Sequence, residues 1–359
     1  MLRVLLLAVL SVAAGAQEYK IAVVGMRHSH VWPHLETMLK GTDAKFVGVA
    51  ESRPEFVERA KRIIPEGLFF TDWKAMIDET KPDVVWAFTE TNRHLEVVEY
   101  CAPRKVHVMV EKPLAATYQE ALEIQALARK YGIQVMTNYG STWQPSIYAA
   151  KTAVDEGAIG PVFRLRTIQG HGGPGDPKKS SFVAWLSDPV KNGGGALVDF
   201  GCYGVLWSLW MKGRPESVYA SALHLKREMF PQVEDHATII LNYNDGVSII
   251  EGSWDLPPHG PAGSEIYGLA GSVQLNGRKI ELRKTAEAQK EAQLEEIAAL
   301  PLPHERSAPI PYMMHHLRSG EPVEGMSALD LNVAVHEALD AAKESIRTGR
   351  SVRLAPVTK

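Results

Sequence analysis

Residues 84–110 read VVWAFTETNRHLEVVEYCAPRKVHVMV, and this stretch decides the fold. It opens with an apolar run over 84–88 and closes with another over 107–110. Between them, residues 95–101 have the apolar spacing of an amphipathic helix. Two short apolar strands joined through a helix form a βαβ unit, in which the strands lie parallel in one sheet.

The same alternation continues on both sides of this stretch. It predicts a Rossmann-like domain over residues 17–140, with a parallel sheet covered by helices on both faces. The further strands are expected at 19–24, 45–50, 69–70 and 134–137. The further helices are expected at 32–39, 54–64, 73–79 and 118–131.

A different pattern follows from about residue 145. After a helix over 146–156, longer alternating runs predict strands at 162–169, 218–225, 237–242, 247–254, 265–269 and 272–275. The turn Asn244-Asp245-Gly246 is a strong hairpin signal. We therefore expect an α+β substrate and oligomerisation domain over 141–359, with a mostly antiparallel open sheet. A helix over 328–348 should pack back on the first domain.

Composition narrows the class of protein. The chain has 359 residues and 45% apolar composition, enough for two packed cores. Its 39 basic and 42 acidic residues form no basic block, which excludes nucleic acid as an expected partner. Cys101 and Cys202 fall in different predicted domains, so we expect free thiols.

The first residues, MLRVLLLAVLSVAAGAQ, have the features of an export signal. A positive start, a short apolar core and Ala14-Gly15-Ala16 predict a Sec signal peptide over 1–16 and a periplasmic or secreted protein. An uncleaved anchor and a cytoplasmic hydrophobic start are the alternatives. No later run of 18 apolar residues occurs, so no membrane association is expected after signal removal.

The turn after the first strand is a partial dinucleotide fingerprint. In Gly25-Met26-Arg27-His28-Ser29-His30 only the first glycine is present, and Arg27 and His30 take the places of the other two. Arg27 could meet the phosphates with charge, beside a helix N-terminus. An ordinary turn that binds nothing is the alternative.

Glu51 ends the second strand, 26 residues after Gly25. A carboxylate there binds the adenosine ribose and repels a 2′-phosphate, which favours NAD over NADP. Arg53 softens that preference, and a solvated acidic residue is the alternative.

Four segments together resemble the Gfo/Idh/MocA family of oxidoreductases in order and spacing. They are Thr89–His94 (TETNRH), Glu111–Pro113 (EKP), Gly193–Gly201 (GGGALVDFG) and the carboxyl end, IRTGRSVRL. In the first, the family's proline and asparagine are missing. The resemblance implies a nicotinamide cofactor and chemistry at a CH–OH group. It implies cofactor contacts at Gly25, Arg27, His28, Ser29, Glu51, Arg53, Thr89, His94, Glu111, Lys112 and Asn138.

The expected catalytic residues are Lys112, Asp199 and Tyr203. The family usually has a histidine as proton acceptor where this chain has Tyr203. The pattern D-x-G-x-Y instead resembles the branch that includes glucose–fructose oxidoreductase and dimeric dihydrodiol dehydrogenase. A tyrosine titrates near 10, so a cation such as Lys112 must adjoin it if it is to act as a base. Lys112 should stabilise the oxyanion and Asp199 should position the substrate; a merely packed tyrosine is the alternative.

The long Gly/Pro/Lys loop over 171–195 is expected to contact the substrate, and a solvated lid is the alternative. Its candidates are His171, Trp185 and Asp188, with Lys178 and Lys179 less defined. No histidines fall at metal-ligand spacing, so no metal is expected.

These features predict an NAD(P)-dependent oxidoreductase that acts on a sugar, a polyol or a related carbohydrate-like substrate. Export implies a tightly held cofactor. Two alternatives stay open: a redox-neutral NAD-dependent glycosidase or lyase, and a non-catalytic sugar-binding relative. The second sheet has a face that needs cover, so a homodimer or homotetramer is expected.

Overall fold

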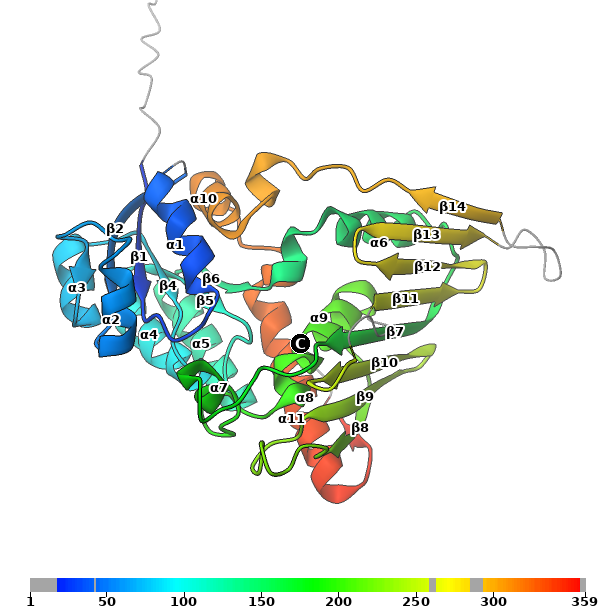
Figure 1. The fold of residues 1–359 in the computed structure, drawn as a ribbon. Helices are drawn as coiled ribbons and strands as arrows, with labels where there is room; N and C mark the ends of the chain where they lie inside the picture. The colour runs from blue at the N-terminus through cyan, green and yellow to red at the C-terminus, as the bar shows by residue number, and fades with distance from the viewer. Residues whose placement is uncertain (1–17, 42, 258–262, 285–292, 356–359) are drawn as a thin grey trace, which may run out of the picture.

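The structure is a computed structural model and describes residues 18–41, 43–257, 263–284 and 293–355. The predicted signal peptide lies outside these residues. The described chain forms two lobes, each built on one sheet (Figure 1). Within these ranges, no helix is both long and apolar enough to cross a lipid bilayer.

The first lobe contains the predicted parallel sheet. Six strands lie in the order β3-β2-β1-β4-β5-β6, and every pairing is parallel. The central strands are apolar on both faces because helices cover both, as a buried parallel sheet requires. The strands are β1 (Lys20–Val24), β2 (Lys45–Ala50), β3 (Phe69–Phe70), β4 (Val84–Ala87), β5 (His107–Glu111) and β6 (Val135–Asn138).

Local capping fixes where the helices of this lobe begin. The Asp72 carboxylate accepts the amides of Lys74 and Ala75, and Thr117 forms a capping box with Glu120. The helices are α1 (Val31–Lys40), α2 (Pro54–Ala60), α3 (Trp73–Thr80), α4 (His94–Cys101) and α5 (Tyr118–Tyr131).

The second lobe is a nine-stranded sheet in the order β14-β13-β12-β11-β7-β10-β9-β8-β15. Only the β7–β10 pair is parallel, which confirms the mostly antiparallel prediction. Its strands are β7 (Val162–Gly170), β8 (Ser217–Leu223), β9 (His236–Tyr243), β10 (Gly246–Ser253), β11 (Gly263–Gly268), β12 (Gly271–Asn276), β13 (Lys279–Lys284), β14 (Gln293–Ile297) and β15 (Val352–Arg353). Its helices are α6 (Pro145–Asp155), α7 (Ser181–Leu186), α8 (Ala196–Asp199) and α9 (Gly201–Lys212).

Two late helices connect the lobes. α11 (Leu329–Thr348) packs against α9 and β8 of the second lobe and against α5 of the first. α10 (Pro309–Ser319) inserts Met313 and Met314 into the core of the first lobe, which the sequence analysis did not predict. Cys101 and Cys202 are buried free thiols, as expected.

Candidate active site

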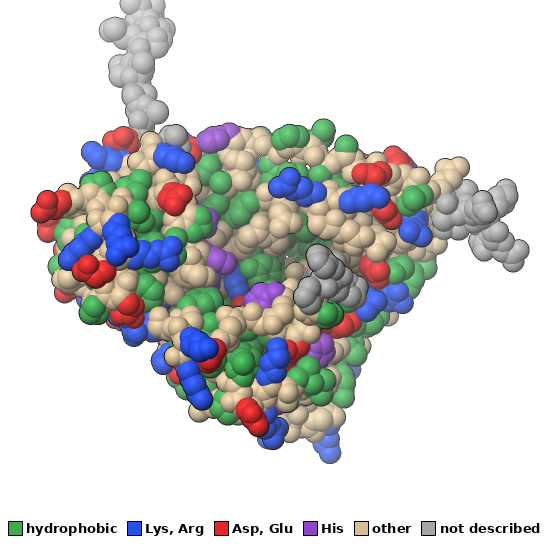
Figure 2. Space-filling model, in the orientation of Figure 1, with side chains coloured by type: hydrophobic (Ala, Val, Ile, Leu, Met, Phe, Trp, Pro, Cys, Tyr) green, Lys and Arg blue, Asp and Glu red, His purple; other side chains and the backbone are tan. Residues whose placement is uncertain are grey.

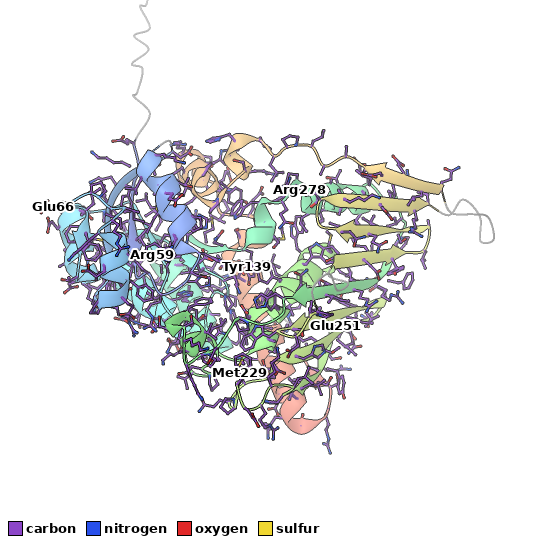
Figure 3. All side chains as sticks on the ribbon, in the orientation of Figure 1. Arg59, Glu66, Tyr139, Met229, Glu251 and Arg278 are labelled. Atoms are coloured by element: carbon purple, nitrogen blue, oxygen red, sulfur yellow. The ribbon has the colours of Figure 1, made fainter. Side chains whose placement is uncertain are left out.

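The predicted site residues gather where the carboxyl ends of β1, β4 and β5 face the second lobe. Open α/β sheets bind their ligands at this edge. Figure 2 shows a hollow between the two lobes on this face, with histidine side chains along it. Figure 3 places Tyr139, which follows β6, between the two sheets.

Lys112 and Asp199 form a buried ion pair across the cleft. Lys112 follows β5, Asp199 ends α8, and neither side chain is more than 7% exposed. The Lys112 Nζ also donates to the Asp199 carbonyl at 3.1 Å. The second carboxylate oxygen of Asp199 accepts the Trp254 indole N–H at 2.9 Å. Both Asp199 oxygens are therefore occupied, and Asp199 holds Lys112 rather than presenting a free carboxylate to a substrate.

This pairing fixes both charges. Burial lowers the pKa of Lys112, but Asp199, Tyr203 and Cys202 together raise it more, so the net pKa shift is upward. Burial raises the pKa of Asp199, but Lys112, Trp254 and His171 together lower it by a larger amount, so the net pKa shift is downward. An ammonium that stays charged at neutral pH therefore faces the cleft.

Tyr203 lies on α9 beside this pair. Lys112 Nζ is 5.2 Å from the centre of the Tyr203 ring, which packs edge-on against Tyr139 at 5.1 Å. Burial raises the pKa of the Tyr203 hydroxyl above its usual value, and Lys112 offsets only part of that rise. The sequence predicts that Lys112 makes Tyr203 a base near neutrality. The geometry corrects this expectation, because the charge of Lys112 is already balanced by Asp199 and Tyr203 stays protonated.

The turn after β1 is shaped to receive phosphate oxygens. Gly25 has φ 77°, and a Cβ there would lie 2.9 Å from Thr89 Cγ2, so glycine is required. Within the described residues, the backbone amides of Arg27 and Ser29 donate no hydrogen bond. These free amides lie just before α1, whose N-terminus favours an anion. The turn therefore fits the diphosphate of a dinucleotide despite its missing glycines.

Glu51 lies beside this turn, at the end of β2. Its Oε2 accepts the Met26 amide at 2.9 Å, and its Oε1 accepts the amides of Ser52 and Arg53 at 2.8 and 2.9 Å. These bonds hold the carboxylate in a pocket that Gly25, Arg53, Trp73 and Thr89 also line. The position fits the expected contact with a ribose.

Arg27 and Glu90 form a second buried ion pair, which the sequence analysis did not predict. Arg27 Nη1 lies 2.6 Å from Glu90 Oε1, and both side chains are about nine-tenths buried. Arg53 Nη2, on a half-exposed side chain, lies 3.8 Å from the same oxygen. Burial lowers the pKa of Arg27, and Glu90 only partly restores it. The loops after β1 and β4 are thus joined by this pair.

Glu111 is oriented by a chain of hydrogen bonds. Its Oε1 accepts the Asn138 amide at 2.6 Å, and Asn138 Oδ1 accepts the Trp143 indole N–H at 2.8 Å. Its Oε2 meets His30 Nδ1 at 2.9 Å. The Glu111 carboxylate, at the buried end of β5, is therefore fixed in position next to Lys112.

His28, His30 and Glu111 form a cluster that sequence spacing did not reveal. Their potential ligand atoms all lie within 4.8 Å of one another, a set that could hold a divalent metal ion. Burial lowers the pKa of His28, which keeps its imidazole neutral. We call these three residues the His–Glu cluster.

His94 is buried, and its Nε2 has no hydrogen-bond partner among the described residues. Its Nδ1 donates to the Leu114 carbonyl at 3.1 Å, and burial lowers its pKa to about 4. The Lys112–Pro113 peptide bond that precedes Leu114 is cis. His94 therefore supports the loop that carries Lys112.

The expected substrate contacts fall into two groups. His171 is exposed at the cleft; its ring packs edge-on against Phe200 at 4.9 Å, and its Nδ1 accepts the Gly173 amide. Its Nε2 is thus left as the donor. Trp185 is 1% exposed, and Asp188 caps the turn at Val190. The structure corrects these last two expectations: a buried indole cannot stack on a sugar, and Asp188 organises its own loop.

We call residues 181–192 the interlobe segment. This segment lies against the two cofactor loops, which are the loops after β1 and β4. Lys178 and Lys179, just before it, are exposed. Three hydrogen bonds tie it to these loops: Trp185 Nε1 to the Arg27 carbonyl (3.4 Å), the Asn92 amide to the Lys191 carbonyl (2.9 Å) and Thr91 Oγ1 to Asn192 Oδ1 (3.1 Å).

The first lobe has a parallel sheet and a turn that can receive phosphate, and the second lobe closes over a lysine. Together these features define a two-domain dinucleotide-dependent protein. Family comparisons agree. Residues 19–139 match the oxidoreductase family with an NAD-binding Rossmann fold, and residues 147–274 match the GFO/IDH/MocA C-terminal domain. The chain therefore belongs to the Gfo/Idh/MocA family, as expected. The family's NAD-binding fold confirms the expected cofactor.

Individual relatives are more distant. Levoglucosan dehydrogenase of Pseudarthrobacter phenanthrenivorans is 26% identical over 64% of this chain and 64% of its own length. Trans-1,2-dihydrobenzene-1,2-diol dehydrogenase of Xenopus laevis is 28% identical over 66% of this chain and 68% of its own. Across three curated relatives, the matched region spans 49% to 64% of the relative.

A solved structure matches over a longer stretch. The aldose-aldose oxidoreductase from Caulobacter crescentus, complexed with glycerol, has a TM-score of 0.80 at 22% identity. The match covers 94% of this chain and 100% of that one. At this identity, the likeness establishes the fold.

Proposed function

We propose that this protein is an NAD-dependent oxidoreductase that acts on the CH–OH group of a sugar, a polyol or a related diol. The observation that carries the proposal is the charged Lys112, buried against Asp199, with its Nζ 5.2 Å from the centre of the Tyr203 ring, next to the dinucleotide-receptive turn. Relatives named for levoglucosan and for a dihydrodiol support this substrate class.

The residues divide the chemistry among themselves. When bound, NAD accepts or returns the hydride. The Lys112 ammonium stabilises negative charge on the substrate oxygen, and Asp199 and Trp254 hold that ammonium in place. The Tyr203 hydroxyl, which forms no hydrogen bond among the described residues, gives its proton to that oxygen in the reducing direction and regains it in oxidation.

The cofactor should remain bound through many turnovers. The N-terminal sequence predicts export to a compartment with little free nicotinamide, and the interlobe segment is hydrogen-bonded to both cofactor loops. A retained cofactor also suits the redox-neutral candidate, in which a sugar is oxidised transiently, loses its glycosidic substituent and is reduced again. The two candidates differ in whether NADH accumulates.

The deciding experiment uses the purified, unliganded protein. Nicotinamide released on denaturation should approach one equivalent per chain. Incubation with a panel of sugars, polyols and glycosides should then produce NADH if the protein is a dehydrogenase, or a free aglycone without net NADH if it is a glycosidase. A protein that releases no nicotinamide and binds none when titrated with NAD or NADP would refute both, leaving the sugar-binding alternative.

We further propose a homodimer or homotetramer through the outward face of the second sheet. Its cross-strand neighbours Tyr219, Ile240 and Ile249 form a partly exposed apolar row, while helix α9 covers the opposite face. Light scattering should give at least twice the chain mass, and Ile249→Lys should lower it. A monomer at all concentrations would contradict this assembly.

A further inference from the structure

Two departures from the family's motifs meet in one ion pair. Arg27 stands where the dinucleotide fingerprint has its second glycine, and Glu90 stands where the family's turn after β4 has proline. Their side chains are joined at 2.6 Å and are nearly buried. Arg27 and Glu90 carry opposite charges, so each neutralises the charge that the other brings into this buried place.

The pair lies on the path that a dinucleotide must take. Along the sheet the order is β2, β1, β4, β5. Glu51, at the end of β2, marks the adenosine half, and Lys112, after β5, marks the reacting half. A cofactor that reaches from one to the other crosses the ends of β1 and β4, where Arg27 and Glu90 meet. Its diphosphate therefore passes beside them.

The Arg27–Glu90 pair leaves one hydrogen-bond donor and one acceptor unpaired among the described residues. Arg27 Nε and Glu90 Oε2 are both buried and have no hydrogen-bond partner among the described residues. A guanidinium with a spare donor can bind a phosphate, whereas a carboxylate in the same place repels one. Arg53, half-exposed and 3.8 Å from Glu90, can receive the carboxylate once Arg27 has left it.

We infer that Glu90 is an internal anion that Arg27 exchanges for the cofactor's diphosphate. In the cofactor-free protein Glu90 neutralises Arg27; on binding, Arg27 pairs with the diphosphate and Glu90 pairs with Arg53. In both states Arg27 faces an anion and Glu90 faces an arginine. Glu90 therefore weakens dinucleotide binding by competing for Arg27, and the inference rests on the proposed function, that this cleft binds NAD.

Glu90→Gln tests the exchange, because an amide keeps a hydrogen bond to Arg27 but loses the charge. Cofactor-stripped protein is titrated with NAD by calorimetry, with inorganic pyrophosphate as competitor. We expect the variant to bind both at least about tenfold more tightly, a difference of about 1.4 kcal/mol. Glu337→Gln, which alters the Arg214–Glu337 pair away from the cleft, should leave both affinities unchanged.

Equal or weaker binding by Glu90→Gln would overturn the exchange and reduce Glu90 to a support for Arg27. If that variant does not fold, Arg27→Gln is compared with the double variant Arg27→Gln/Glu90→Gln. The double variant should bind NAD more tightly than the single one, since it lacks the repelling carboxylate; no gain would also overturn the exchange. A wild-type protein that binds no dinucleotide at all would instead refute the proposed function.

Discussion

Tyr203→Phe isolates the proton-transfer step, because it removes one hydroxyl and keeps the ring. The ring contacts with Tyr139 at 5.1 Å and with Phe200 at 6.3 Å remain. The hydroxyl has no hydrogen-bond partner among the described residues, so its loss leaves no buried group unpaired. We therefore expect the free energy of unfolding to change by less than about 0.5 kcal/mol.

The turnover of Tyr203→Phe, in contrast to its stability, should fall steeply. General acid–base catalysis contributes about 10²–10⁴-fold, or about 3–5 kcal/mol of activation free energy. The assay is steady-state NADH formation with a substrate found in the panel, alongside cofactor content and thermal unfolding. Tyr139→Phe is the matched control, since it removes from the adjacent ring a buried hydroxyl that has no hydrogen-bond partner among the described residues, and it should leave turnover intact. If Tyr203→Phe retains its turnover, the reasoning is refuted and His171, whose Nε2 has no hydrogen-bond partner among the described residues, becomes the next candidate.

Three further predictions follow from the same geometry. Lys112→Ala leaves the Asp199 carboxylate buried without its cation, so it should abolish turnover and lower the free energy of unfolding by about 3–5 kcal/mol; combined with Tyr203→Phe it should cost no more than the sum of the two losses in turnover. Because the pKa of Tyr203 is raised, the hydroxyl stays protonated through neutral pH; substrate oxidation should accelerate as pH rises into the alkaline range while reduction stays constant, and an oxidation rate that levels off near neutrality would argue against this residue. The expectation of no metal stays a prediction, so dialysis against a chelator should leave activity unchanged; a loss restored by Zn²⁺ would show instead that the His–Glu cluster binds a metal ion.

The fold was predictable where hydrophobic pattern dominates. The strands of the first lobe are continuous apolar runs, so their positions were predicted to within a residue or two. β13 (KIELRK) and β14 (QLEEI) were not predicted, because charged side chains obscure their alternation. α10 was also missed: it begins with two prolines, and only tertiary packing shows that its methionines belong to the core of the other lobe.

The site was predictable at strand ends and unpredictable across loops. Lys112 and Glu111 follow a clear strand, so their position at the ligand-binding edge could be inferred. The Arg27–Glu90 pair joins loops that are 63 residues apart, and nothing in either segment alone signals the contact. Trp254 was overlooked because its only signal is an aromatic residue at a strand end, and its role depends on the position of Asp199.

The interlobe segment couples the opening of the cleft to the release of the two loops that border the cofactor. Its three hydrogen bonds run from the second lobe to both loops that border the cofactor. Rotating one lobe away from the other would break these bonds in the same motion that widens the entrance. The protein therefore cannot open its cleft for a bulky molecule and at the same time keep the loops after β1 and β4 bonded to the interlobe segment. The architecture therefore favours compact substrates that enter without a hinge rotation, and it discourages long chains that would need the entrance held open.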